Sequence, residues 1–280
     1  MRMLRNAALL LALAAPAGAG EVVRDLAAPS AALGRDLGYA LYRPDGARHA
    51  LPTVYLLHGR DGGPADWLDM AHAARTADRL IAEGRIPPML IVMPAAGNSW
   101  YAGPMAAAIA HDLPARIEAR HGARPARAAR ALAGNSMGGF GALGIALAHP
   151  DRFAAAAAMS GAFWASLDTD VPLDDARRAR VARVFQGAFG TPFDRPAFRR
   201  HSPSALARDF PDGAPKPAIY LVSGAEDRFG LAGQARDLFG VLTATGFDAA
   251  FETIPGDHDW GTWERALPMA LEFIARRWAR

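Results

Sequence analysis

Short apolar runs alternate with amphipathic segments along most of the 280-residue chain. The runs at 51–59 (LPTVYLLHG) and 88–95 (PMLIVMPA) are continuously hydrophobic and end in turn signals, which is typical of strands buried on both faces. The same reading predicts further strands at 129–134, 152–161, 216–224 and 248–256, and helices at 105–122, 138–150, 231–246 and 262–280. The pattern at 152–161 suits either a strand or a helix, and its place in the alternation favours a strand. Strands that alternate with helices predict an α/β fold, with a mostly parallel sheet covered by helices on both faces.

The alternation breaks at 162–215. This stretch holds one predicted helix near 174–185, followed by residues rich in proline, glycine, phenylalanine and arginine. Insertions into an α/β sheet often lie above the carboxyl ends of the strands, where ligands bind. We therefore expect a small cap that borders a pocket, although a plain surface excursion remains an alternative.

The first nineteen residues have the order of a secretory signal peptide. Arg2 and Arg5 precede an apolar run from Ala7 to Ala15, and small residues up to Ala19 follow. The run is well short of the roughly 20 residues that a spanning helix needs. We expect cleavage after Ala19, export to the periplasm or the medium, and one domain over 20–280 with no membrane attachment. An uncleaved anchor is the alternative.

Composition narrows the possible chemistry. The chain has no cysteine, which excludes disulfides, thiolate metal sites, a lipidated cysteine anchor and a cysteine nucleophile. The formal charge of +3 falls to +1 without Arg2 and Arg5. Arginines spaced through alanines at 124–131 and 174–183 are typical of solvated helix faces, so we expect no nucleic-acid partner.

One serine lies among four glycines in AGNSMGGFG, residues 133–141. Residues 134–138 fit the pattern G-x-S-x-G, between a predicted strand and a predicted helix. In a nucleophile elbow the serine occupies a strained turn, and its neighbours are small because the strand and helix backbones approach closely. Ser136 is therefore the candidate nucleophile.

A serine hydroxyl needs a base, and the base needs an orienting acid. Of the eight histidines, His258 follows the last predicted strand and can reach the elbow from its loop, whereas His58 and His149 are expected to be structural. The acid should follow the strand at 216–224, where Glu226 and Asp227 are adjacent. Spacing does not choose between them, and we favour Asp227.

Asp257 and Asp259 flank the histidine and are weaker candidates for the acid. Acyl transfer also needs donors for an oxyanion. The backbone N–H groups of Met137, after the nucleophile, and Arg60, after a strand end, are the candidates.

The chain resembles the putative esterase (esterase D) family of α/β-hydrolases over nearly all of 35–278. The resemblance is carried by YLLHGRDGGPADW (55–67), NSWY (98–101), GNSMGGFGAL (134–143), HPDRFAAAAAMSG (149–161), FG followed by HSPSALA (189–207), SGAEDRF (223–229) and PGDHDWGTWERAL (255–267). The family's G-x-x-D matches Gly224 to Asp227, and its histidine matches His258. The position of Arg60 supplies an oxyanion N–H in relatives, often from another residue type.

The resemblance implies the α/β-hydrolase fold and cleavage of esters or thioesters without a metal or organic cofactor. The family includes S-formylglutathione hydrolases, feruloyl and acetyl xylan esterases, and mycolyltransferases of the antigen 85 type. We expect an exported serine carboxylesterase that acts on small or polysaccharide-linked esters such as feruloyl or acetyl esters. The alternatives are acyl transfer of the antigen 85 type, hydrolysis of S-formylglutathione, which export disfavours, and siderophore ester hydrolysis. Trp100 and Tyr101 are candidate substrate contacts, and the sequence predicts no oligomeric state.

Overall fold

The computed structural model describes residues 18–46 and 49–278. Eight strands form one sheet in the order β1-β2-β4-β3-β5-β6-β7-β8. The strands are β1 Glu21–Ser30, β2 Arg35–Arg43, β3 Thr53–Leu57, β4 Leu90–Pro94, β5 Arg130–Asn135, β6 Ala155–Met159, β7 Ala218–Gly224 and β8 Ala249–Ile254. β1 and β2 pair antiparallel, as do β2 and β4, and every other pair is parallel.

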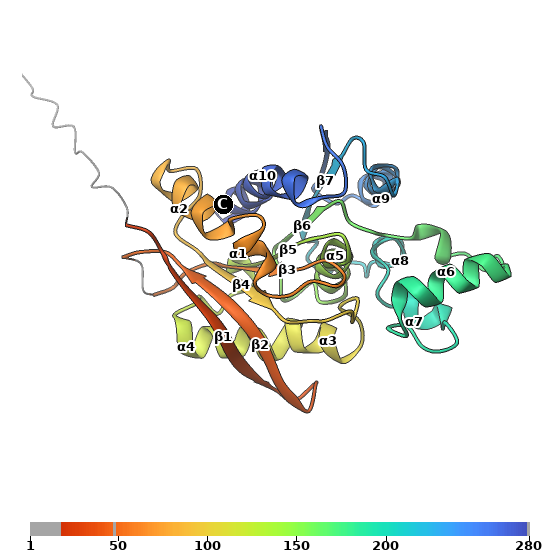
Figure 1. The fold of residues 1–280 in the computed structure, drawn as a ribbon, viewed down its shortest axis with the longest axis horizontal. Coiled ribbons are helices and arrows are strands. Elements are labelled where there is room, and N and C mark those ends of the chain that lie inside the picture. The colour runs from red at the N-terminus through yellow and green to blue at the C-terminus, as the bar shows by residue number, and fades with distance from the viewer. Residues whose placement is uncertain (1–17, 47–48, 279–280) are drawn as a thin grey trace, which may run out of the picture.

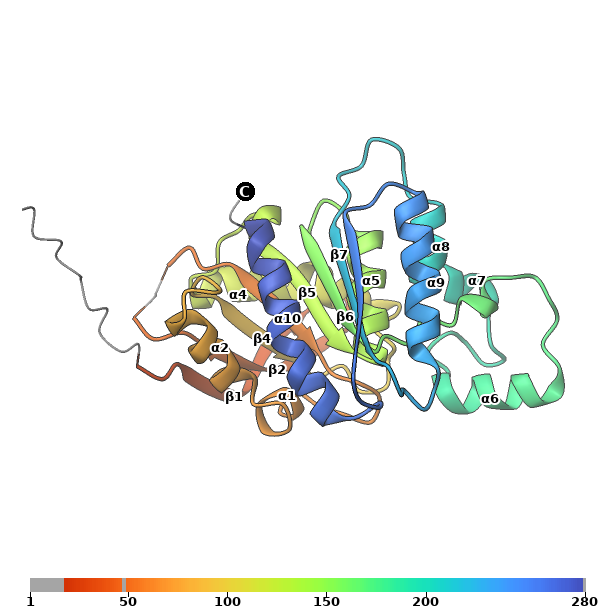
Figure 2. The same ribbon diagram turned by 90° about the horizontal axis from the view of Figure 1, so that it is seen from above.

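Helices cover both faces of the sheet (Figures 1 and 2). The helices named below are α1 Asp66–Asp69, α2 Ala73–Ala82, α3 Pro104–Ala107, α4 Leu113–His121, α5 Met137–Ala148, α6 Asp175–Phe185, α7 Arg195–Arg199, α8 Pro203–Arg208, α9 Leu231–Ala244 and α10 Trp260–Trp278. Side chains of α1, α2 and α10 pack on one face, and those of α4, α5 and α9 pack on the other. This arrangement confirms the predicted fold class.

The central strands show why continuous apolar runs form them. In β3, Tyr55 and Leu57 enter the core on one face, while Val54 and Leu56 enter the core on the other. Successive strand side chains point to opposite faces, so a strand between two helical layers must be apolar at every position. The predicted strand at 152–161 is likewise strand β6, Ala155–Met159.

The predicted helix at 105–122 is broken into three pieces around Pro114. α3 and α4 are joined by a π-helical turn over Ala108–Asp112. Proline lacks an N–H, and its ring clashes with the carbonyl four residues earlier in a regular helix. A wider π turn relieves that crowding, and Pro114 then occupies the first turn of α4, where its missing donor is tolerated.

The stretch 162–215 follows β6 and contains α6, α7 and α8. α6 begins after Asp174, whose side chain accepts a hydrogen bond from the Arg177 N–H at 2.8 Å. Phe185 and Phe198 of this stretch belong to an aromatic cluster that reaches Phe140 of α5. The stretch is therefore packed on the core of the sheet, while α6 projects beyond α9 at the edge of the molecule (Figures 1 and 2).

The predicted signal segment lies outside the described residues except for Gly18 and Ala19. Within 18–46 and 49–278, no helix combines the length and apolar character needed to cross a bilayer.

Candidate active site

Ser136 lies in a sharp turn between β5 and α5. Its backbone has φ +51° and ψ −114°, a conformation that residues other than glycine rarely adopt. The turn is held on both sides, because the Ser136 N–H donates to the Met159 carbonyl at 3.0 Å and its own carbonyl accepts from the Phe140 N–H at 3.1 Å. The serine is thus presented at the carboxyl end of the sheet with its backbone fixed.

The glycines around Ser136 make room for close backbone contacts. A Cβ on Gly138 would lie 2.3 Å from the Leu57 carbonyl oxygen and 2.7 Å from that of His58. A Cβ on Gly134 would lie 2.5 Å from the carbonyl carbon of Gly138. The glycine-rich motif therefore reflects tight packing of strand against helix and not a flexible loop.

Gly138→Ala is expected to lower the free energy of unfolding by about 3 kcal/mol, since the added methyl group must push apart two backbones. Urea unfolding followed by circular dichroism measures the change. Gly233→Ala in α9 is the matched control, because nothing lies within 4 Å of the Cβ position there. The control should be stabilised by about 0.5–1 kcal/mol, as expected for alanine in a helix. Equal stability of the two variants would contradict the packing argument.

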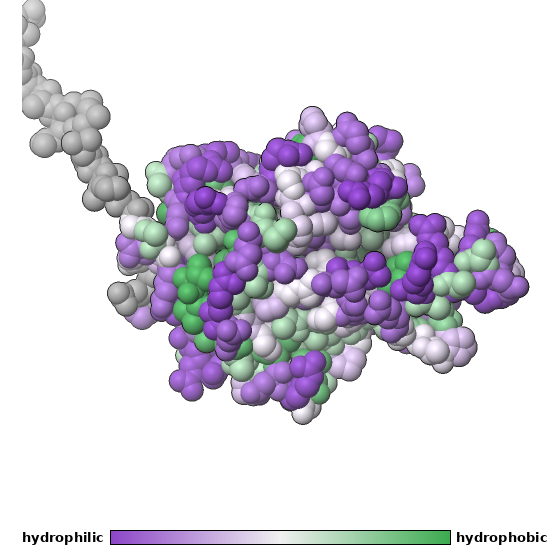
Figure 3. Space-filling view, viewed as in Figure 1, coloured by the Kyte–Doolittle hydropathy of each residue, from purple (hydrophilic) through white to green (hydrophobic). Residues whose placement is uncertain are grey.

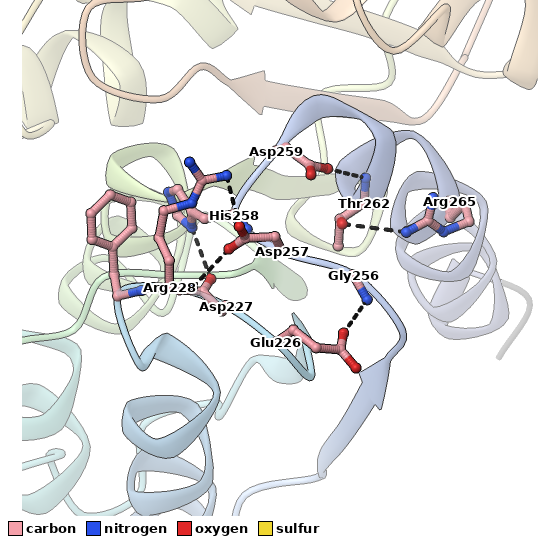
Figure 4. Close-up of polar contacts among 10 residues, drawn as sticks. Glu226, Asp227, Arg228, Gly256, Asp257, His258, Asp259, Thr262 and Arg265 are labelled. Carbon is pink, nitrogen blue, oxygen red and sulfur yellow. Dashed lines mark hydrogen bonds and ion pairs between the residues drawn. The ribbon is translucent and has the colours of Figure 1, made fainter.

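Three side chains distant in sequence meet at this turn. His258 Nε2 lies 3.0 Å from Ser136 Oγ, and His258 Nδ1 lies 2.9 Å from Asp227 Oδ2. A carboxylate only accepts, so Nδ1 carries the hydrogen towards Asp227 and Nε2 accepts from the serine hydroxyl. Asp227 follows β7 and His258 follows β8, and Figure 4 shows their contact.

Asp227 is held as a carboxylate. Its side chain is fully buried, and Oδ1 accepts a hydrogen bond from the Phe229 N–H at 2.9 Å. Burial raises the pKa of Asp227, but the hydrogen bond to His258, the charge interaction with it and the N–H groups of Phe229 and Leu231 outweigh burial. The pKa of Asp227 is therefore lower than its usual value.

The neighbouring Asp257 shapes the loop that carries His258. Asp257 Oδ1 accepts from the N–H groups of Arg228 at 2.7 Å and His258 at 2.6 Å, and Oδ2 pairs with the Arg228 guanidinium at 2.8 Å (Figure 4). These backbone hydrogen bonds, together with the arginine, lower the pKa of Asp257 to about 2. This carboxylate joins the loop after β7 to the loop after β8.

The two other acids considered from sequence also bind backbone groups. Glu226 accepts from the Gly256 N–H, and Asp259 accepts from the Thr262 N–H at 2.8 Å in the first turn of α10 (Figure 4). Of the four acids weighed from sequence, Asp227 is the one that meets the histidine ring.

The two candidate oxyanion donors lie beside the serine. Met137 is the first residue of α5, where an N–H has no partner within its own helix. Gly59 approaches Ser136 closely, since a Cβ there would be 3.6 Å from the serine Cβ, and Arg60 follows it. Arg60 lines the pocket, and its guanidinium lies 3.6 Å from the Asp61 carboxylate.

A pocket of about 620 Å³ opens over Ser136 and His258. Aromatic and basic residues are prominent in its lining, namely Trp100, Trp164, Phe229, Trp260, Trp263, Arg60, Arg180 and Arg183. Trp100 reaches it as expected, and its Nε1 donates to the Val184 carbonyl of α6 at 3.2 Å.

Tyr101 is not among the pocket residues, which differs from the expectation. It is 1% exposed, and its hydroxyl donates to the His58 carbonyl at 3.1 Å. The ring lies where a Cβ on Gly141 of α5 would stand. Tyr101 therefore supports the strand end below the pocket, because it points into the core while its neighbour Trp100 reaches the pocket.

His58 and His149 lie away from the serine. The His58 ring is buried, with Nδ1 donating to the Gly59 carbonyl at 2.7 Å and Nε2 accepting from the Ala96 N–H at 3.1 Å. Burial lowers the pKa of His58 and of His149, and a nearby histidine, His111, lowers that of His149 further. The ring of His149 packs edge-on against that of His111.

Sequence reasoning missed Arg180 and Arg183, whose side chains line the pocket from α6. The available signal was their spacing of three residues next to Val184, which places all three on one helix face.

Among residues 18–46 and 49–278, no group of three or more histidine, aspartate or glutamate side chains has the arrangement of a metal site.

The fold and this site together define a serine hydrolase of the α/β-hydrolase class, an enzyme that acts on ester bonds. Residues 30–274 match the family model described as "Putative esterase", so the chain belongs to that family. The resemblance inferred from the sequence motifs is confirmed.

Named relatives agree with this membership. The chain is 25% identical to an acetyl esterase of Caldicellulosiruptor saccharolyticus over 235 residues, which cover 81% of this chain and 84% of that protein. It is 28% identical to the MPT51/MPB51 antigen of Mycobacterium tuberculosis over 276 residues, covering 91% of this chain and 87% of the antigen. The structure of a ferulic acid esterase superposes with a TM-score of 0.73 at 25% identity, covering 92% of this chain and 98% of that one.

Proposed function

We propose that the protein is an exported carboxylesterase that works through a covalent acyl-enzyme formed on Ser136. The observation that carries the proposal is the pair of contacts at His258, 3.0 Å to the serine Oγ and 2.9 Å to the Asp227 carboxylate. Nucleophile, base and orienting acid at hydrogen-bond distance are the arrangement that activates a serine hydroxyl.

In the proposed reaction, Ser136 Oγ attacks the ester carbonyl while His258 Nε2 takes its proton. The imidazolium then gives that proton to the leaving alcohol, and Asp227 stabilises the charged ring throughout. In the second half water attacks the acyl-enzyme, with His258 as the base. The bond between the acyl group and Oγ then breaks, the carboxylic acid leaves, and the imidazolium returns its proton to Ser136 Oγ. The N–H groups of Met137 and Arg60 are proposed to hold the oxyanion, and losing one such donor costs about 2.7–4 kcal/mol in other enzymes.

Export and the cap are part of the same proposal. The order of charged, apolar and small residues in 1–19 supports export. The position of α6 along the pocket supports a cap role for 162–215, since Arg180, Arg183 and Val184 all line it. Trp100 is proposed as a substrate contact on the same ground.

Feruloyl or acetyl esters are the proposed substrates. Relatives named acetyl esterase and ferulic acid esterase support this choice, as does a pocket of about 620 Å³ with tryptophan walls.

The purified enzyme is expected to hydrolyse 4-nitrophenyl acetate and methyl ferulate at rates well above the spontaneous reaction. Released phenol and ferulate, followed by absorbance and chromatography, measure turnover. The same reactions with added glycerol show whether acyl groups go to water or to an alcohol, since a transferase would favour the alcohol. Failure to cleave any member of an acetyl, butyryl and feruloyl series would contradict the proposed function.

A further inference from the structure

The wall of the pocket formed by α6 carries two guanidinium groups that pair with no carboxylate among residues 18–46 and 49–278. Arg180 and Arg183 both line the pocket, together with Val184 one residue further on. Within the part of the chain that the structure describes, Arg180 contacts the ring of Trp164, with its guanidinium carbon 5.1 Å from the ring centroid, and neither arginine forms an ion pair.

The other arginines at the start of α6 differ in this respect. Arg177 pairs with Asp174 at 3.8 Å, and Arg178 pairs with Asp175 at 2.8 Å. The two acids at the start of the helix therefore form ion pairs with the arginines that do not line the pocket. The surface over α6 is mostly hydrophilic (Figure 3). Within this helix, no acid pairs with the two arginines that line the pocket.

α6 is held in this position by contacts at its carboxyl end. The Trp100 indole donates to the Val184 carbonyl at 3.2 Å, and the Asn98 amide donates to the Gln186 side chain at 3.1 Å. Trp100 also packs edge-on against Phe185, with ring centroids 4.7 Å apart. The carboxyl end of α6 is therefore anchored to the loop that follows β4, and the two arginines line the same pocket as Ser136.

Within the described residues, neither aspartate that lines the pocket forms an ion pair with Arg180 or Arg183. Asp61 lies 3.6 Å from the Arg60 guanidinium and accepts from the Asn98 amide at 2.7 Å. Asp66 accepts from the Gly63 N–H at 3.0 Å, within its own loop. A ligand that reaches both Ser136 and α6 thus meets two guanidinium groups that have no ion pair or side-chain hydrogen bond to the part of the chain that the structure describes.

We propose that Arg180 and Arg183 form a subsite for an anionic group, so that the preferred substrates are esters that carry a carboxylate. The inference rests on the proposed esterase function and adds a substrate class to it. Guanidinium groups present planar pairs of donors that match a carboxylate, and an aromatic ring beneath Arg180 orders its side chain. The carboxylate belongs either to the acyl part or to the alcohol part of the ester.

Two matched pairs of esters test the proposal and locate the charge. 4-Acetoxybenzoate and its methyl ester differ by a carboxylate on the alcohol part. The 4-nitrophenyl monoester of suberic acid and its methyl ester differ by a carboxylate on the acyl part. For each pair, the ratio of kcat/KM for the anionic ester to that for the neutral ester is measured in wild type and variants, which cancels differences in intrinsic reactivity.

The double variant Arg180→Gln/Arg183→Gln is expected to lower this ratio about fivefold for one of the pairs, since two partly exposed charge contacts are lost. Arg180→Lys/Arg183→Lys should recover most of the ratio because it keeps both charges. Raising the salt concentration should lower the ratio in wild type but not in the glutamine variant. The control Arg177→Gln/Arg178→Gln removes the same charge from the same helix outside the pocket and should leave the ratio unchanged.

A ratio that is the same in wild type and in the Arg180→Gln/Arg183→Gln variant for both pairs would overturn the subsite. An equal loss in the Arg177→Gln/Arg178→Gln control would also overturn it, because the effect would then come from the general charge of α6. Turnover of the neutral esters in either case leaves the esterase function standing. If wild type cleaves none of the four esters, the proposed function fails and the subsite fails with it.

Discussion

Ser136→Ala is expected to lower kcat for ester hydrolysis by about 10⁶-fold, the size of effect seen when a serine nucleophile is removed from another hydrolase. Without Oγ no acyl-enzyme forms, and His258 Nε2 loses the hydroxyl that lies 3.0 Å away. The backbone of the turn is held by its own hydrogen bonds to Met159 and Phe140, so the variant should fold normally. Initial rates with 4-nitrophenyl acetate measure the loss.

A fluorophosphonate probe gives an independent readout of the same variant. Wild type should be labelled on Ser136, and Ser136→Ala should not be labelled. Ser166→Ala is the control, since Ser166 is exposed outside the pocket lining. Retained hydrolysis or retained labelling in a folded Ser136→Ala protein would show that another group is the nucleophile.

Asp227→Asn is the second substitution with a large expected effect, a loss of about 10⁴-fold in kcat. An asparagine amide presents a donor or a weaker acceptor to His258 Nδ1, which allows the tautomer with the hydrogen on Nε2. That tautomer cannot accept the proton of Ser136. The imidazolium formed during the reaction also loses a buried negative charge 2.9 Å away.

The pH dependence of kcat/KM tests the role of His258 as the base. Because the pKa of Asp227 is lowered below its usual value, Asp227 stays a carboxylate at neutral and mildly acidic pH. The acid side of the kcat/KM profile in wild type should therefore report one ionisation, with activity falling as the imidazole takes up a proton and ceases to be a base.

Glu226→Gln is the matched control for Asp227→Asn, because a glutamine oxygen can still accept from the Gly256 N–H. Loss in the control with full activity in Asp227→Asn would reverse the assignment of the acid.

The central part of the fold could be predicted because its strands are apolar at most positions. β3 and β4 are buried on both sides, which leaves a continuous hydrophobic run in the sequence. β1 and β2 were missed. β1 is an edge strand that is mostly exposed and contains Asp25 and Pro29, so tertiary pairing with β2 defines it more than its composition does.

The site was predictable where chemistry fixes both residue type and chain order. Ser136, Asp227 and His258 each follow a different strand, and parallel strands bring their carboxyl ends to one edge. The direction of a single side chain after a strand is decided by packing, which is why Trp100 reaches the pocket and Tyr101 does not. The arginines of α6 resembled a solvated face in the sequence, because only the folded chain brings that helix to the serine.

The carboxylate of Asp257 holds the loop that carries His258, whereas Asp227 contacts the histidine ring itself. Asp257 accepts from the backbone N–H groups of Arg228 and His258 and, with a pKa of about 2, remains ionised at neutral and mildly acidic pH. Mild acid therefore leaves the contact between the loop after β7 and the loop after β8 in place. We expect activity lost on brief exposure to mild acid to return on neutralisation, because this contact between the two loops persists.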